Sequence, residues 1–181
     1  MRALKQKHRD IYIHVYEEKE LVYTDQTGKF PTTSSRGNKY LMVLYYMDGS
    51  YIMMEPMKSR HENEMIRVHN ILIEQLKTRG FHPKKQMLDN EVSKAYQKAT
   101  ENQGMEVEKV PIEAHQHNAA EKAIQTAKNH LKVILAGCDD SFPMHLWDRL
   151  LPQAEPTLNL LRQFNVAPTV SVYQYVHGVF D

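Results

Sequence analysis

Three short segments of the sequence each carry a carboxylate where it could bind a divalent metal ion. Asp25 follows an apolar run, Asp89 follows Met87 and Leu88, and Glu121 lies near the start of an amphipathic segment. Oxygen ligands from separate elements suit hard cations such as Mg²⁺, which keep several waters and bridge to phosphates. A pair of such ions can activate an attacking oxygen and stabilise a departing one. The three carboxylates therefore predict metal-dependent phosphoryl transfer.

The composition restricts the class of protein. With 181 residues, 41% of them hydrophobic, the chain is long enough for one domain with a real core. The net charge of +1 means that any affinity for DNA must come from local basic groups. The single cysteine, Cys138, excludes a disulfide within the chain. The longest apolar stretch, near residues 41–50, is too short for a membrane span, and the charged first twenty residues cannot be a secretory signal.

Hydrophobic periodicity predicts the elements that must position the three carboxylates. The predicted strands are Leu21–Thr24, Lys39–Met47, Tyr51–Met57, Lys85–Leu88 and Met105–Val110. The predicted helices are Glu62–Arg79, Val92–Asn102 and Asn118–Leu135, followed by a helical region, Pro143–Arg162, that is interrupted by Pro152 and Pro156. An Asp48-Gly49 turn joins the second and third strands. The tail to Asp181 is expected to be irregular.

This order of elements predicts an α/β fold. Three strands joined as a meander, followed by alternating helices and strands, favour a mixed five-stranded sheet flanked by helices. The first three strands would be antiparallel and the last two parallel. We expect a lead-in segment over residues 1–20, a catalytic core over 21–165 and a C-terminal tail of that core over 166–181.

The segment that contains Glu121 has two distinct faces. Polar residues recur on one face at Glu121, Gln125, Lys128 and Lys132. An apolar face lies beside it, formed by Ala120, Ile124, Ala127, Leu131 and Leu135. An ordinary amphipathic helix with Glu–Lys pairing accounts for this pattern. A metal-binding carboxylate with lysines that grip DNA phosphates accounts for it as well.

Several ordered motifs resemble the integrase catalytic core of copia-type LTR retrotransposons, within the retroviral integrase and ribonuclease-H-like group. The resemblance covers about residues 20–181. Its motifs are Asp25-Gln-Thr-Gly28-Lys-Phe-Pro31, Ser35-Arg-Gly37-Asn38-Lys39-Tyr40, Asp89-Asn90, Gln116-His-Asn118-Ala-Ala-Glu121, Leu146-Trp147, Thr157-Leu-Asn159-Leu-Leu-Arg162, and Pro168 with Tyr173.

The resemblance implies a ribonuclease-H-like fold and a DNA polynucleotidyl transferase. Asp25, Asp89 and Glu121 would be the catalytic residues, and they would bind two Mg²⁺ or Mn²⁺ ions. Lys128 would touch the element's DNA end, and the other expected DNA-binding residues are Lys132, Gln125, Lys122 and Asn118. The expected partners are element and target DNA and further copies of the chain, with no membrane. The chain would act in the nucleus, after a cytoplasmic particle stage, as a piece of a longer polyprotein.

Two other functions stay open. The interval between Asp89 and Glu121 is shorter than the retroviral pattern, and Glu91 and Ala119 stand where that pattern has glycine. These departures favour an inactive or repurposed copy that serves as a DNA-binding or assembly module. An RNA-cleaving ribonuclease H would share the fold and the metals, and an RNA–DNA hybrid substrate would test it.

Overall fold

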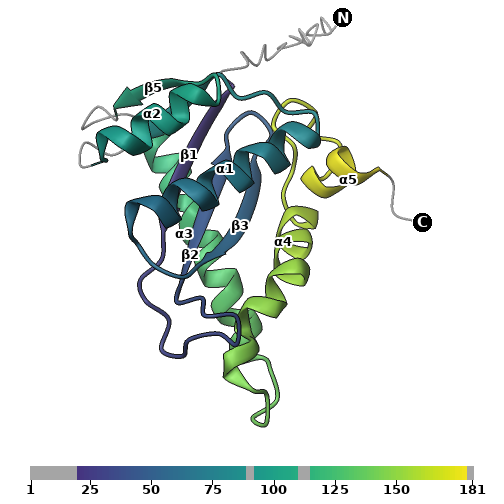
Figure 1. The fold of residues 1–181 in the computed structure, drawn as a ribbon. Helices are drawn as coiled ribbons and strands as arrows, with labels where there is room; N and C mark the ends of the chain where they lie inside the picture. Colours follow the sequence, from purple (N-terminus) through teal and green to yellow (C-terminus); the bar gives the residue numbers. More distant parts are fainter. Residues whose placement is uncertain (1–19, 89–91, 110–114, 179–181) are drawn as a thin grey trace, which may run out of the picture.

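The computed structural model describes residues 20–88, 92–109 and 115–178. In the last of these ranges, the backbone is described from residue 115 and the side chains are described from residue 120. Over these residues a five-stranded sheet carries helices on both faces (Figure 1). The strands are β1 (Leu21–Gln26), β2 (Tyr40–Tyr46), β3 (Tyr51–Met57), β4 (Lys85–Leu88) and β5 (Glu106–Lys109). All five predicted strands are present, with small shifts at their ends.

The sheet has the order β3-β2-β1-β4-β5, which puts β1 at its centre. β1 pairs antiparallel with β2, and β2 pairs antiparallel with β3. β4 runs parallel to β1, and β5 runs parallel to β4. The predicted mixed sheet, with three antiparallel strands followed by two parallel ones, is confirmed.

Helices cover both faces of this sheet. They are α1 (Glu62–Thr78), α2 (Lys94–Asn102), α3 (His115–Ala136), the 3₁₀ helix η1 (Met144–Leu150), α4 (Leu151–Leu160) and α5 (Val172–His177). α1 lies in front of the sheet in Figure 1 and α3 lies behind it. The predicted helix Asn118–Leu135 is thus present, and it begins earlier, at His115.

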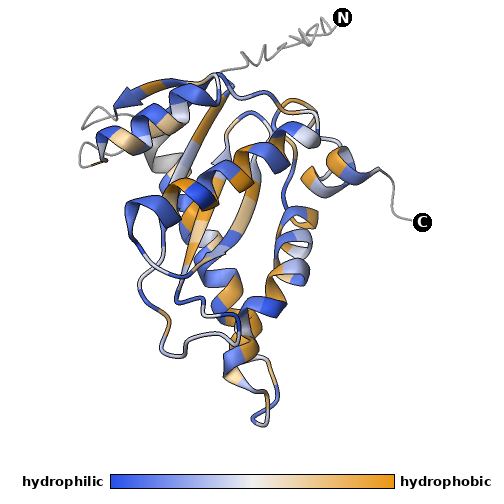
Figure 2. Cartoon of the chain, viewed as in Figure 1, coloured by the Kyte–Doolittle hydropathy of each residue, from blue (hydrophilic) through white to orange (hydrophobic). Residues whose placement is uncertain are grey.

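Two apolar cores, one on each face of the sheet, follow from the alternation of the strands. The core under α1 includes Val22, Met42, Leu44, Met53, Val68, Leu72 and Leu76. The core under α3 includes Leu21, Tyr23, Val43, Ile124, Ala127, Leu131, Trp147 and Leu158. Figure 2 shows the same pattern, with hydrophobic strands between helices whose outer sides are hydrophilic. Among the described residues, no helix is long and apolar enough to cross a membrane.

The turn between β2 and β3 is present where Asp48-Gly49 predicts it. Ser50, with φ at 53°, takes the left-handed conformation, and its N–H donates to the Met47 carbonyl at 3.1 Å. Gly49 has a different role, because a Cβ at this position would come within 2.9 Å of the Phe164 ring. The glycine allows the C-terminal segment to pack closely against the hairpin.

The C-terminal third differs from the prediction in two ways. The tail was expected to be irregular, but it contains α5, with Ser171 as its N-cap and Val172 buried against the α1 side of the sheet. The preceding helical region changes from η1 to α4 directly before Pro152, as predicted, but α4 continues through Pro156 without the predicted interruption. Pro152 stands in the first turn of α4, where its missing N–H has no helical partner to lose, and Pro156 lies inside that helix.

Candidate functional site

Asp25 lies near the end of β1, on the face that α3 covers. Leu21 and Tyr23, on the same face of β1, are buried, whereas the Asp25 side chain is 54% exposed. Its backbone is held in register opposite Val43 of β2. Its Oδ1 accepts a hydrogen bond from the Gln26 N–H at 2.7 Å. The sheet therefore presents a carboxylate at a fixed position on the border of the buried core.

Lys128 of α3 contacts this carboxylate. Its Nζ lies 2.5 Å from Asp25 Oδ2. The contact is a consequence of helix packing, because Ala127 and Leu131 are buried under α3 and leave Lys128 at the border of the core. Since Asp25 is half exposed, such a pair stabilises the fold by only about 0–1 kcal/mol. The geometry shows instead that a cation is well placed next to Asp25.

A cavity of about 360 Å³ opens beside Asp25. Its other lining residues are Thr24, Gln26, Arg60, Glu62, Met65, Leu88, Val92, Ser93 and Tyr96. Leu88 is the last residue of β4 and directly precedes Asp89 in the sequence. The parallel pairing of β1 with β4 thus brings the carboxyl ends of both strands to one cavity, a common place for functional residues in α/β folds.

Arg60, Ser93 and Tyr96 line this cavity and are not among the predicted site residues. Ser93 caps α2 by accepting a hydrogen bond from the Tyr96 N–H at 3.2 Å, and a serine before a helix is a recognisable signal. Arg60 donates to the Thr27 carbonyl and lies over the Tyr40 ring, 5.2 Å from its centroid. These partners are distant in sequence, so no local pattern indicates the position of Arg60.

Behind Asp25, a buried polar network supports β1. The Gln86 amide donates to Thr24 Oγ1 at 3.1 Å and its oxygen lies 2.6 Å from His69 Nε2. The Tyr96 hydroxyl lies 3.4 Å from Thr24 Oγ1. Burial raises the pKa of Tyr96 to about 12 and lowers the pKa of His69. The network is therefore uncharged near neutral pH, so it positions the strand and adds no charge beside Asp25.

Of the other two predicted carboxylates, the structure describes only Glu121. Glu121 is exposed on α3, seven residues before Lys128, which corresponds to about 10 Å along the helix axis. The two residues lie on one face of the helix, as predicted. Asp89 lies outside the described residues. The described geometry therefore brings Asp25 to Lys128 and puts Glu121 further along the same helix.

The predicted DNA-binding residues all lie on α3. Lys122, Gln125 and Lys132 are exposed, while Lys128 is half-buried. The Gln125 amide donates to Asn129 Oδ1 at 2.9 Å. The side chain of Asn118 lies outside the described part. The described members form one polar surface of α3 next to the buried stripe of Ala120, Ala123, Ile124, Ala127 and Leu131.

The donor chemistry at Asp25 suits a divalent metal ion. Its carboxylate provides hard oxygen ligands at an exposed border, and Lys128 already holds a positive charge against it. Among the side chains that the structure describes, in residues 20–88, 92–109 and 120–178, no three of His, Cys, Asp or Glu are grouped closely enough to hold a metal ion. Asp89, the predicted second ligand, is not among them. Asp25 thus fits a metal site as one member of a ligand set.

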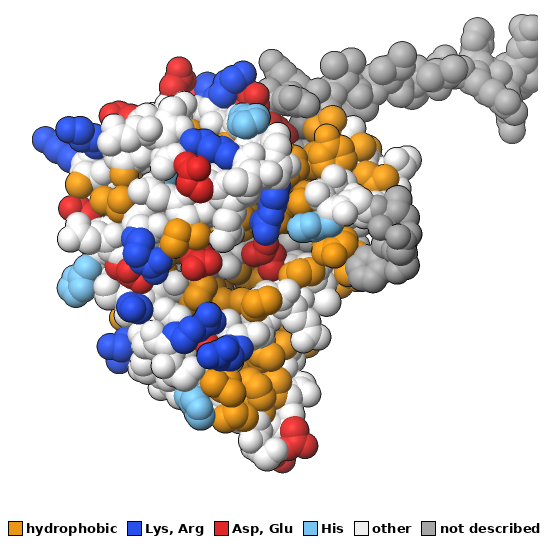
Figure 3. Space-filling model, turned by 45° about the vertical axis from the view of Figure 1, so that its right-hand side comes forward, with side chains coloured by type: hydrophobic (Ala, Val, Ile, Leu, Met, Phe, Trp, Pro, Cys, Tyr) orange, Lys and Arg blue, Asp and Glu red, His pale blue; other side chains and the backbone are white. Residues whose placement is uncertain are grey.

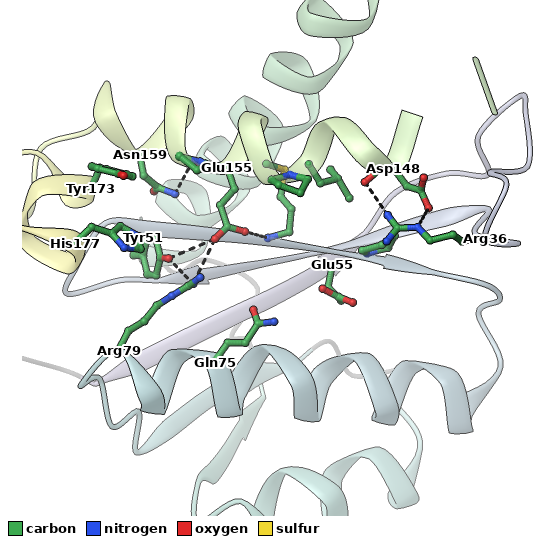
Figure 4. Close-up of a pocket in the computed structure, with 15 residues that line it drawn as sticks. Arg36, Tyr51, Glu55, Gln75, Arg79, Asp148, Glu155, Asn159, Tyr173 and His177 are labelled. Carbon is green, nitrogen blue, oxygen red and sulfur yellow. Dashed lines mark hydrogen bonds and ion pairs between the residues drawn. The ribbon is translucent and has the colours of Figure 1, made fainter. Parts of the chain in front are cut away.

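A second cavity, of about 420 Å³, lies between α1 and α4 beside the edge strand β3 (Figure 4). Glu155 Oε2 accepts from the Met54 N–H at 2.9 Å, and its other oxygen lies 3.3 Å from Arg79. The Asn159 side chain accepts from the Ile52 N–H at 3.1 Å and donates to the Ile52 carbonyl at 2.7 Å. These side chains close the open edge of the sheet, which would otherwise expose unpaired backbone groups.

Asp148 lies at the other end of this groove, where it pairs with side chains that precede β2. The Arg36 guanidinium and the Asn38 amide donate to its Oδ2 at 2.9 and 2.7 Å. Burial by itself would raise the pKa of Asp148, but hydrogen bonds from Asn38, Arg36 and Ser34 outweigh burial and hold it below the usual range. Because Asp148 pairs with Arg36 and Glu155 pairs with Arg79, we interpret the groove as a structural feature.

Charged side chains of both signs are interspersed on the face turned forward in Figure 3. This agrees with the net charge of +1. That face therefore has no uniform basic field, and an interaction with a polyanion would depend on local groups of lysine or arginine.

No family model matches the chain, and a search of curated proteins finds no match. Among solved structures, the chain is similar to the catalytic core domain of BIV integrase, with a TM-score of 0.63 and 14% sequence identity. The match covers 87% of this chain and 93% of that one. The chain therefore has the ribonuclease-H-like fold of an integrase core, as the sequence predicted.

Proposed function

We propose that the chain is the catalytic core of a copia-type LTR retrotransposon integrase. It is a DNA polynucleotidyl transferase and endonuclease that trims element DNA at its 3′ ends and joins those ends to target DNA. The observation that carries this proposal is the exposed Asp25 carboxylate at the end of β1, beside the cavity that also receives the end of β4. The integrase-core fold supports it.

In this proposal Asp25, Asp89 and Glu121 would hold two Mg²⁺ or Mn²⁺ ions. Such ions, when bound, activate a water or a DNA 3′-hydroxyl and stabilise the departing oxygen. The protein contributes positioning, because β1 fixes Asp25 in register and the buried network behind Thr24 supports that strand. No side chain needs to form a covalent intermediate.

The polar surface of α3 would hold the DNA backbone. Lys128 and Lys132 would contact phosphates, and Asn118, Lys122 and Gln125 would extend this contact toward the start of the helix. Phosphate contacts of this kind position the duplex without reading its sequence. We propose that the chain acts in the nucleus, after a cytoplasmic particle stage, and forms a homo-oligomer on DNA. Sedimentation with and without a DNA duplex tests the assembly.

A nicking and strand-joining assay on labelled duplex DNA with Mn²⁺ tests the activity. We expect product with the wild type, and a loss of more than about a hundredfold in Asp25→Asn and in Asp89→Asn, since even residues that only orient a metal ligand affect activity by about 10–100-fold. Asp140→Asn, an exposed carboxylate in a loop, is the matched control. Equal activity of Asp25→Asn and the control would disprove the proposed role of Asp25.

The Asp25–Lys128 contact also suits the second function, an inactive DNA-binding or assembly module in which the lysine permanently neutralises the carboxylate. Thermal unfolding with Mn²⁺ separates the two functions. A competent site gains about 2.7 kcal/mol at a hundredfold excess of metal over Kd, and Asp25→Asn removes this gain. A repurposed module binds DNA but shows no stabilisation by Mn²⁺ that depends on Asp25.

A further inference from the structure

A hollow of about 490 Å³ lies between α3 and the segment that follows β1. It is lined by Thr27, Gly28, Lys29, Phe30, Pro31, Leu41, Gln125, Lys128, Leu131, Lys132, Leu135 and Met144. Its size falls within the range of about 300–1,000 Å³ that is typical of small-ligand sites. Lys128, which contacts Asp25, is part of its lining. The hollow therefore adjoins the proposed catalytic carboxylate.

The wall of this hollow is apolar and held in place. Leu131 and Leu41 belong to the buried core, and Phe30 packs against the same core. The Phe30 ring stacks on Trp147, with ring centroids 4.0 Å apart and planes at 1°. Trp147 is buried, and its indole N–H donates to the Thr32 carbonyl at 3.0 Å. The surface that a ligand would contact is thus formed before the ligand binds.

The charged groups of this hollow are all positive. Lys29, Lys128 and Lys132 line it, and none of its described lining residues is Asp or Glu. The cavity beside Asp25 and the groove between α1 and α4 each contain both arginine and carboxylates. An apolar wall with lysines and no acidic group favours a ligand that has an apolar planar part and negative charges.

We propose that this hollow binds an unpaired nucleotide of a DNA strand, with its base against the apolar wall and adjacent phosphates on the three lysines. The inference rests on the proposed function and specifies the form of DNA that the site holds. Bases that leave the duplex are commonly held by stacking and apolar contact, while lysines follow the backbone.

The spacing of the lysines favours a nucleic-acid strand over a ligand with one negative charge. Lys128 and Lys132 are one helical turn apart, about 6 Å along the axis of α3, so they offer two positive charges in a row. Lys29 adds a third from the segment after β1. Because Lys128 also reaches Asp25, a strand that passes the proposed catalytic carboxylate continues directly into the hollow.

Binding of two labelled single strands, measured by fluorescence anisotropy at low salt and without metal ions, tests the proposal. One strand is an oligothymidylate, and the other has the same length and charge but an abasic backbone. We expect the wild type to bind the strand with bases about fivefold more tightly or better, as a stacked base provides. Both strands have the same number of phosphates, so the phosphate contribution to affinity cancels in the comparison. The ratio of the two Kd values therefore reports the contribution of the bases alone.

Gly28→Leu is the variant that blocks the hollow. A Cβ at Gly28 meets no atom within 4 Å, and its backbone is outside the left-handed region, so the new side chain enters open space without strain. We expect this variant to lose the preference for bases and to keep its affinity for the abasic strand. Lys132→Glu should weaken binding of both strands. Lys98→Glu, an exposed site on α2, is the control for charge, and melting temperatures verify folding.

Equal binding of the two strands by the wild type, or a preference for bases that survives Gly28→Leu, would overturn the proposal. The nicking assay separates this failure from that of the proposed function. Product that depends on Asp25, together with equal binding, refutes only the assignment of the hollow. A preference for bases without any product refutes the transferase and leaves a nucleotide-binding site.

Discussion

At the scale of single residues, the pair of Asp25 and Lys128 is the feature from which function is inferred. The two residues are 103 positions apart in the sequence, and their charged atoms are 2.5 Å apart. An exposed pair of this kind contributes little to stability. The pair leaves a carboxylate and a lysine at the surface, and in the proposed function they would bind a metal ion and a DNA phosphate, respectively.

Lys128→Met tests this interpretation. We expect the free energy of unfolding to fall by no more than about 1 kcal/mol, because the Asp25 carboxylate that remains is half exposed and stays hydrated. DNA binding should weaken, since the proposed phosphate contact is lost. Urea denaturation and anisotropy measure the two effects. Arg67→Met, which removes the surface pair with Glu64, is the control for stability. A loss of several kcal/mol specific to Lys128→Met would make the pair structural.

At the scale of elements, α4 covers the open edge of the sheet. β3 is an edge strand, and its outward N–H groups at Ile52 and Met54 donate to Asn159 and Glu155. Both of these side chains come from α4 (Figure 4). Pro56, further along the same strand, has no N–H to satisfy. The helix therefore replaces a missing sixth strand at this edge and prevents pairing with another chain.

Asn159→Ala should be strongly destabilising. The amide is 1% exposed and satisfies both backbone groups of Ile52, which is itself fully buried. A buried polar group left unpaired costs about 1–3 kcal/mol, so we expect a loss of at least about 2 kcal/mol in the free energy of unfolding. Asn129→Ala removes an exposed amide on α3 that accepts a hydrogen bond from Gln125, and it should change stability by less than about 0.5 kcal/mol. Similar losses in both variants, measured by denaturation, would contradict the role of α4.

At the scale of the whole molecule, one buried network joins four elements. His69 of α1 contacts Gln86 of β4, which reaches Thr24 of β1, and Thr24 lies next to Tyr96 of α2. Because His69 is fully buried, desolvation lowers its pKa below the ordinary value. This network connects the two halves of the sheet beneath the candidate site.

The stability of the molecule should therefore depend on pH through His69. In the unfolded chain a histidine takes up a proton below a pH of about 6.5, whereas the folded protein resists protonation. The unfolded state then binds more protons, so the free energy of unfolding should fall as the pH decreases below about 6.5, with a slope of up to about 1.4 kcal/mol per pH unit. Above this pH the effect vanishes.

Denaturation curves of the wild type and His69→Gln between about pH 5 and 8 measure this dependence. The glutamine variant should lose less stability on acidification, since it has no ring to protonate. His145→Gln, which removes an exposed ring, should follow the wild type. If His69→Gln loses as much stability as the wild type, another group causes the acid sensitivity.

Local patterns in the sequence determined most elements of the fold. The continuous apolar residues of β2 and of the first half of β1 indicate strands that are covered on both faces, so these strands can be predicted without a structure. The two faces of α3 are readable for the same reason, and their predicted separation is confirmed by burial. α5 was missed because six residues are too few for a periodic pattern, and its packing depends on contacts with other segments, such as the stacking of Tyr175 on Phe164.

Only the tertiary structure decided which distant residues meet. That Lys128 lies against Asp25, that Leu88 shares a cavity with Asp25, and that lysines surround an apolar hollow all depend on strand order and on helix position across the sheet. Periodicity determines which face of an element is buried but does not determine the partner that buries it. The sequence by itself thus determined the candidate carboxylates and the elements that carry them, and packing decided the surroundings in which they act.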